Sequence, residues 1–173
     1  MPKGLKQSSS IIVISNSIDE SAADTFTQKQ VDLQLNALDN EVFVVLAVDM
    51  NPSAPTLITG TNTEVRGSIS QTSRTSVGNV SDTNVLAEAS LAIRSDAVTS
   101  VGFTRMPTEA PLAQLDYIGI IATNDFFLQL KGTNNGAPKA MNTRMWGYRA
   151  VADAATYAAL TQSEILSDWV NAA

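Results

Sequence analysis

The chain has 173 residues, the length of one domain, and 44% of them are hydrophobic, which is typical of a globular protein rather than a disordered one. It contains no cysteine and no histidine, and this excludes disulfides, Cys nucleophiles, Ser-His-Asp triads and metal sites built on thiolate or imidazole. The net charge is −6, and apart from Lys3 and Lys6 the cations are scattered along the sequence, so a phosphate-tracking surface is not expected, although a local patch could still form in the fold. No apolar run reaches the roughly 18 residues that a membrane helix needs.

Strand patterns begin at residues 11–15, a short β-branched run that is also too short for the apolar part of a secretion signal. Residues 28–36 alternate apolar and polar side chains, which predicts a strand with one face in water. Residues 41–50 follow the turn signal Asp39-Asn40 and are expected to pair with that strand as a hairpin. Both faces of 41–50 are apolar, so each face is expected to be covered.

The next segments are more polar. Residues 51–56 are expected to form a loop, because their two prolines cannot continue a strand ladder. Residues 63–76 predict a polar strand, suited to a sheet edge or an assembly surface, with Val65 and Ile69 as its large apolar residues. Residues 84–95 are ambiguous: their Ala, Leu and Glu favour a helix, whereas their alternation favours a strand, and we favour a short helical turn that runs into a strand.

Further strands follow towards the C-terminus. Residues 100–106 predict a strand and 107–112 a loop. The runs 117–122 and 126–131 flank the polar triplet 123–125, and this arrangement predicts an antiparallel hairpin.

The last strand is predicted at residues 142–152 and is followed by a helix with Asp153 as its N-cap. Within the helix, Thr161 and Glu164 have the spacing of a capping box, so a break at Thr161 is expected.

Eight or nine short strands without βαβ alternation predict an all-β antiparallel sandwich or small barrel with a short C-terminal helix. The expected organisation is an N-terminal segment over residues 1–10, a β-sandwich domain over 11–152 and a helical segment over 153–173 packed on the sandwich or on a neighbour. In strand 41–50, one apolar set is expected to fill the core, namely Val42, Val44, Leu46 and Val48. The helix or a neighbouring subunit is expected to cover Phe43, Val45 and Ala47, using Ala155, Ala158, Ala159, Leu166 and Trp169.

Few residues suggest chemistry. Carboxylates lie close in sequence at three places, Asp19/Glu20, Asp39/Glu41 and Asp116/Asp125, and these are interpreted as solvated turn residues rather than a glycosidase pair. No EF-hand loop is present, which leaves open only a calcium site between subunits. Residues 132–139 lack the phosphate-loop pattern, and Asn79-Val80-Ser81 is a weak match to a glycosylation triplet. We therefore predict that the protein is not an enzyme and has no catalytic residue, cofactor or metal site.

Residues 145–149, "MWGYR", place Trp146 and Tyr148 on one strand face, with Arg144 at the same parity. Trp, Tyr, Arg and Met are enriched at protein–protein contacts. Ordinary packing inside a sandwich explains the cluster equally well, so both interpretations stay open.

The segments "LDYIGIIATNDFFLQLKGTNN" (115–135) and "RMWGYRAVADAATYAALTQSEILS" (144–167) resemble the C-terminal half of small coat proteins from environmental tailless icosahedral viruses, of the single jelly-roll type. The resemblance covers roughly residues 79–168. It implies a jelly roll of about eight strands in two sheets, self-association into an icosahedral shell, and a virion location. Many related coat proteins carry a basic N-terminal arm, but this chain has only Lys3 and Lys6 there, so strong direct nucleic-acid binding is not expected.

Three hypotheses follow for function. The leading one is a structural shell subunit whose partners are copies of itself, with other virion proteins as further candidates. The alternative is a carbohydrate-binding or adhesin-type β-sandwich, which predicts exposed aromatic residues on a concave face and a monomer in solution. The third is a hydrolase based on carboxylates, which requires two convergent buried acids.

Overall fold

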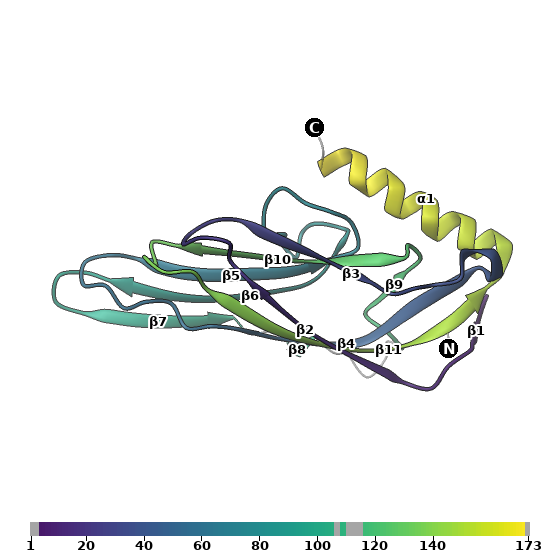
Figure 1. The fold of residues 1–173 in the computed structure, drawn as a ribbon, viewed down its shortest axis with the longest axis horizontal. Coiled ribbons are helices and arrows are strands. Elements are labelled where there is room, and N and C mark those ends of the chain that lie inside the picture. Colours follow the sequence, from purple (N-terminus) through teal and green to yellow (C-terminus); the bar gives the residue numbers. More distant parts are fainter. Residues whose placement is uncertain (1–3, 106–107, 110–115, 172–173) are drawn as a thin grey trace.

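The computed structural model describes residues 4–105, 108–109 and 116–171, which form two antiparallel sheets followed by a helix (Figure 1). The first sheet contains β2 (Ile12–Asp19), β11 (Ala140–Ala152), β4 (Glu41–Pro52) and β9 (Gly119–Ile121). Two short strands, β1 (Leu5–Gln7) and β8 (Thr108–Glu109), extend its edges along β11 and β4. The second sheet contains β3 (Thr27–Asp32), β10 (Asp125–Thr133), β5 (Thr63–Ser70), β6 (Val85–Ser95) and β7 (Ser100–Arg105) in that order.

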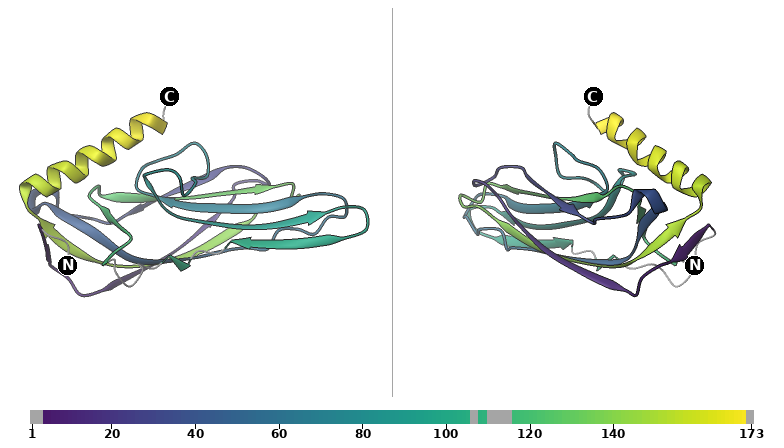
Figure 2. Two further views of the ribbon diagram at one scale, coloured as in Figure 1. Left: turned by 180° about the vertical axis from the view of Figure 1, so that it is seen from behind. Right: turned by 45° about the vertical axis from the view of Figure 1, so that its right-hand side comes forward.

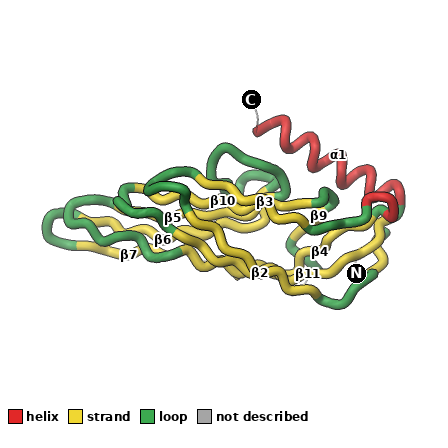
Figure 3. Tube along the Cα trace, in the orientation of Figure 1, coloured by secondary structure: helices red, strands yellow, loops and turns green. Residues whose placement is uncertain are grey.

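The strand pairs are nested along the chain. β2 pairs with β11, β3 with β10, β4 with β9 and β5 with β6, so the members of successive pairs lie ever closer in the sequence. One long antiparallel ribbon that pairs in this way and rolls into two sheets is a jelly roll. The predicted all-β antiparallel sandwich with a short C-terminal helix is therefore confirmed (Figure 3).

The main core lies between the two sheets and is built from alternate side chains of their strands. Its largest fully buried members are Phe43, Met50, Ile69, Ile121 and Phe126. Burial of each large apolar side chain contributes about 1.5–3 kcal/mol, so this cluster is the chief source of stability of the sandwich.

A β-bulge in β4 reverses the predicted assignment of its two faces. Ala47 pairs with Trp146 and Val45 pairs with Gly147, so Leu46 is an extra residue on β4. Phe43 and Val45 point into the main core, as do Val48 and Met50 beyond the bulge. The prediction that Val42 and Val44 fill the core while Phe43 and Val45 lie outside was wrong, because strict alternation does not allow for the inserted residue.

Two predicted hairpins are wrong for one reason, which is that their strands belong to different sheets. β9 pairs with β4, whereas β10 pairs with β3 and β5, so the polar triplet 123–125 crosses from one sheet to the other. In the same way β3 pairs with β10 and not with β4. In a jelly roll most consecutive strands lie in opposite sheets, so a short polar turn between two strand patterns does not establish that they pair.

Two further predictions are corrected in the second sheet. β5, expected at an edge, is a central strand between β10 and β6, and its Ser68 and Ser70 are fully buried. Residues 85–95 form a strand throughout, without the helical turn that we favoured. The predicted loop 107–112 lies mostly outside the described residues, and its described part is β8, paired with β4.

The helix α1 (Ala154–Asn171) is continuous, so the expected break at Thr161 is absent. The carboxylate of Asp153 accepts a hydrogen bond from the Thr156 N–H at 2.7 Å, which confirms Asp153 as the N-cap. The Thr161 hydroxyl donates to the Tyr157 carbonyl one turn back and therefore takes no part in a second cap. Figure 2 shows the helix rising from one end of the sandwich. Within the described residues, no helix combines the length and apolar character needed to span a bilayer.

Candidate interaction surfaces

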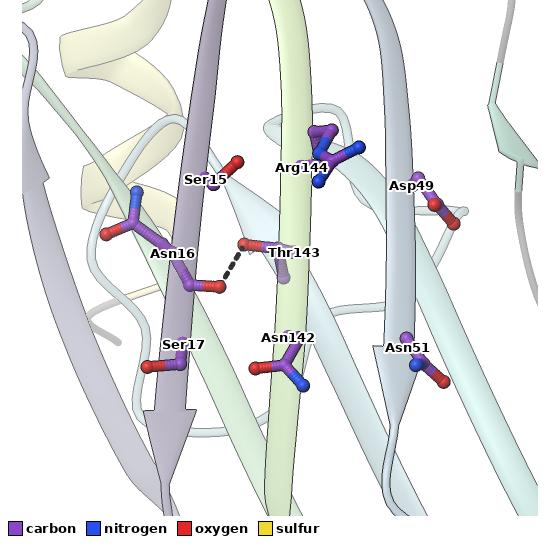
Figure 4. A pocket seen from close by; sticks show the side chains of 8 residues that line it. All are labelled: Ser15, Asn16, Ser17, Asp49, Asn51, Asn142, Thr143 and Arg144. Carbon is purple, nitrogen blue, oxygen red and sulfur yellow. Dashed lines mark hydrogen bonds between the residues drawn. The ribbon is translucent and has the colours of Figure 1, made fainter.

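A polar hollow of about 480 Å³ lies on the face of the first sheet that is turned away from the core (Figure 4). Register arranges its lining in rows across β2, β11 and β4. One row is Ser17, Asn142 and Asn51, and the next is Ser15, Arg144 and Asp49. These side chains are exposed and offer hydroxyl, amide, carboxylate and guanidinium groups within one shallow site.

An aromatic ring lies beside the hollow. The guanidinium carbon of Arg144 is 5.8 Å from the centre of the Trp146 ring, which is a cation–π distance. Arg144, Trp146 and Tyr148 do share one strand face, as the sequence indicated. Their environments differ, because Arg144 is exposed, Trp146 is half-buried and Tyr148 is buried beneath other side chains.

Three of the carboxylates that are close in sequence have partners within the fold. Glu20 is buried and accepts hydrogen bonds from the backbone N–H groups of Gly132 and Lys139, at 2.5 and 2.8 Å. Glu41 pairs with Arg149 at 3.2 Å. Asp125 accepts a hydrogen bond from Gln30. The described residues also hold no cluster of three acids suited to a metal ion.

The loop at residues 71–84 folds back over the outer face of the second sheet, where it covers a buried polar network. Gln129 donates to Ser70 and accepts from Ser68, and the Gly78 N–H donates to the Ser68 hydroxyl at 2.8 Å. Arg74 fastens the loop by donating to Asn84 and Asp82, at 2.8 and 2.7 Å. Asn79, the weak glycosylation match, lies exposed in this loop.

The helix covers the second face of β4, where a separate apolar cluster forms. Val42, Val44, Tyr148 and Ala150 pack there against Tyr157 and Leu160 of the helix, among other residues. The prediction that the helix or a neighbouring subunit covers Phe43 and Val45 is therefore wrong, because the helix covers Val42 and Val44 on the opposite face. Burial raises the pKa of the Tyr148 hydroxyl.

One buried carboxylate holds the helix against the sandwich. Glu164 accepts hydrogen bonds from the backbone N–H groups of Ala122 and Thr123, at 2.8 and 2.9 Å. Burial raises the pKa of Glu164, and the two N–H donors partly offset that rise. The sequence indicated Glu164 only as half of a capping box, and its true partners, some 40 residues away, follow from tertiary structure alone.

Three groups of apolar side chains stay exposed on separate elements. Ile11 and Val13 lie at β2, and Val98, Val101 and Phe103 lie on or beside β7. The exposed apolar side chains of the helix are Ala155, Ala158, Ala159, Ile165 and Leu166. Trp169, expected on this stripe, is among the helix residues whose side chains the structure does not describe. Contiguous exposed apolar groups usually mark contact sites.

Among known proteins, similarity to this chain is found in solved structures and not in family models or curated sequences. No family model matches the chain, and no curated protein sequence matches it. A solved structure described as Desmodium yellow mottle tymovirus has 12% sequence identity and a TM-score of 0.31, over 88% of this chain and 86% of that one. Both values are too low for this similarity to carry an argument about function.

Proposed function

We propose that this protein is a viral capsid subunit that self-associates into an icosahedral shell and resides in the virion. The observation that carries the proposal is the separation of the three exposed apolar groups, which lie on β2, on the β6–β7 hairpin and on α1. A protein that binds a single ligand needs one contact surface. A subunit of a closed shell needs several different surfaces, because each copy meets several neighbours.

The fold is consistent with this role. Double-sheet jelly rolls occur both in viral capsid proteins and in lectin domains. The fold is therefore compatible with a capsid subunit and with a carbohydrate-binding module, and it does not decide between these two functions. The described residues supply packing, a seated helix and a clamped loop, all of which give a rigid unit. A rigid subunit favours assembly, because the conformational entropy of its loops and side chains is already lost in the monomer and is not lost again at each contact.

Size-exclusion chromatography with light scattering, followed by negative-stain electron microscopy of the particle fraction, tests the proposal. We expect closed particles of uniform diameter that dissociate and re-form with changes in protein concentration. A single species at the monomer mass of 18.4 kDa at every concentration would refute it.

One observation favours the alternative of a carbohydrate-binding module. The polar hollow combines the hydrogen-bonding groups of Asn51, Asn142 and Asp49 with the ring of Trp146 beside it. Sugars are bound by such groups together with an aromatic platform. Binding of soluble oligosaccharides to a monomeric protein, lost in both Trp146→Ala and Asn142→Ala, would favour this alternative over the shell.

A further inference from the structure

Strand register gathers four cations that are scattered in the sequence. Lys131 on β10, Arg66 on β5, Ser90 on β6 and Arg105 on β7 are successive register partners, so they form one row across the second sheet. With strands about 4.8 Å apart, the row spans roughly 14 Å. Arg94 lies four residues along β6 from Ser90, an even separation, and therefore on the same face. We call Arg66, Arg94, Arg105 and Lys131 the cationic face.

The acids of this region lie below its cations. Glu88 accepts from Arg66 at 2.5 Å and lies 3.8 Å from Arg105, yet its side chain is only 5% exposed, against 52% for Arg105. Glu64 pairs with Arg94 at 3.3 Å and is likewise more buried than its partner. Solvent therefore meets mainly positive charge here, on a chain whose net charge is −6.

Apolar side chains border the cationic face at the sheet edge. Phe103 is the register partner of Ala92, and Val101 is the partner of Arg94, so both lie on this same outer face. Both are more than half exposed, and β7 has no strand partner on its other side among the described residues. This surface therefore combines positive charge with the adjacent exposed side chains of Val101 and Phe103. It is complementary to a partner that has negative charge next to a protruding apolar side chain.

The opposite end of the molecule carries such a projection. The turn η1 (Ala37–Asp39) holds Leu38 at 95% exposure, between Asp39 and the end of β3 at Asp32. In Figure 1 this end lies beside the start of α1, far from β7. The Ala152 N–H donates to the Asn40 carbonyl at 3.0 Å, which brings Asp153 to the same place. We call Asp32, Leu38, Asp39 and Asp153 the acidic corner.

The charge of the acidic corner is not cancelled locally. Arg149, which is half-buried, pairs with Glu41 at 3.2 Å, and Lys6 lies on β1 opposite Val151. The turn is also fixed in shape, because the Asn36 side chain accepts from the Leu38 N–H at 3.1 Å and Asn40 adopts a left-handed conformation. A preformed exposed Leu loses little entropy on docking.

We propose that the acidic corner of one copy docks on the cationic face of the next copy, with Leu38 placed against Phe103 and Val101. The two surfaces differ and lie at opposite ends, so the contact is heterologous and joins copies head to tail, as rings and shells require. This inference rests on the proposed function for its partner, which is a second copy of the chain, and on charge and apolar complementarity for its geometry.

Charge exchange tests the contact. The face variant carries Arg105→Glu and Lys131→Glu, the corner variant carries Asp32→Lys and Asp39→Lys, and the combined variant carries all four. Each single-surface variant is expected to raise the protein concentration at half-assembly at least tenfold, and the combined variant to restore it to within threefold of wild type. Association should also weaken with added salt in the wild type, because the contact is charged.

A matched control has the same change of charge elsewhere. Lys29→Glu with Lys139→Glu is expected to assemble as wild type does, and all variants must melt cooperatively. If a Glu variant does not fold, Arg105→Gln with Lys131→Gln replaces it, with the same expected direction. The proposal would be overturned if assembly weakened equally in the control and face variants. It would also be overturned if the combined variant assembled as poorly as the face and corner variants.

The outcomes separate this contact from the shell itself. If the wild type forms shells but the combined variant does not regain assembly, the proposed function is supported and the proposed contact is refuted. Small oligomers that are lost and then rescued support the contact and refute the shell, and a wild-type monomer refutes both. Co-purified nucleic acid that is lost in the face variant and not regained in the combined variant would identify the cationic face as a nucleic-acid surface, which also refutes the contact.

Discussion

Replacement of Glu164 should release the helix from the sandwich. Each hydrogen bond to a charged group contributes about 1.5–3 kcal/mol, and Glu164 accepts two, from Ala122 and Thr123. The desolvation that raises the Glu164 pKa offsets part of this gain, so we expect Glu164→Ala to lower the free energy of unfolding by about 2 kcal/mol. With a urea m-value of about 2 kcal/mol/M, the unfolding midpoint falls by about 1 M.

Chemical denaturation followed by circular dichroism measures that shift, and hydrogen exchange at the Ala122 and Thr123 amides locates it. Glu164→Gln is the matched variant, because it keeps one acceptor oxygen and should lose about half as much stability. An unchanged midpoint in Glu164→Ala, together with unchanged protection of both amides, would refute the idea that Glu164 fixes the helix.

The pH dependence of the same pair has a definite sign. Because the pKa of Glu164 is higher in the folded chain than its ordinary value of 4.5, the folded state holds the proton more tightly than the unfolded state does. Wild type should therefore gain stability relative to Glu164→Gln as pH falls from neutral through the raised pKa, with no further gain well below 4.5. A relative loss of stability over that range would contradict the assigned environment.

The other predictions concern backbone packing, the helix cap and the clamped loop. Gly147→Ala should destabilise by at least about 2 kcal/mol in urea unfolding, because the added Cβ would collide with the Phe43 ring, whereas Gly102→Ala, which meets open space, should leave the midpoint nearly unchanged. Asp153→Ala should reduce helical circular dichroism at neutral pH, and the difference from wild type should vanish as acid protonates Asp153, whose pKa the helix N–H groups hold below its usual range. Arg74→Leu should open the loop 71–84 to limited proteolysis while the sandwich stays folded, and unchanged cleavage would contradict its clamping role.

The fold class follows from sequence because it depends on local periodicity, and most of the predicted strands exist. Pairing does not follow, because a jelly roll joins strands that are far apart in sequence, as β2 and β11 are. The bulge at Leu46 reversed the predicted faces of β4, since no local pattern marks an inserted residue there.

The candidate surfaces were still less visible. The scattered cations argued against a phosphate-tracking surface and left a local patch open, and register places Lys131, Arg66 and Arg105 in one row. Their alignment depends on three pairings between strands, none of which the sequence specifies. By contrast, Asp153 was found correctly, because a helix N-cap is a local signal that lies next to its own partner.

The central claim is that this chain is built to associate with itself through several surfaces, and the mass of the purified protein in solution tests it most directly. Mass photometry over a range of concentrations is expected to show a discrete large species at an integer multiple of 18.4 kDa, with few species between it and the monomer. Because a shell closes cooperatively, species of intermediate mass between the monomer and the shell are scarce. A population of monomers alone, unchanged at the highest concentration measured, would contradict the account.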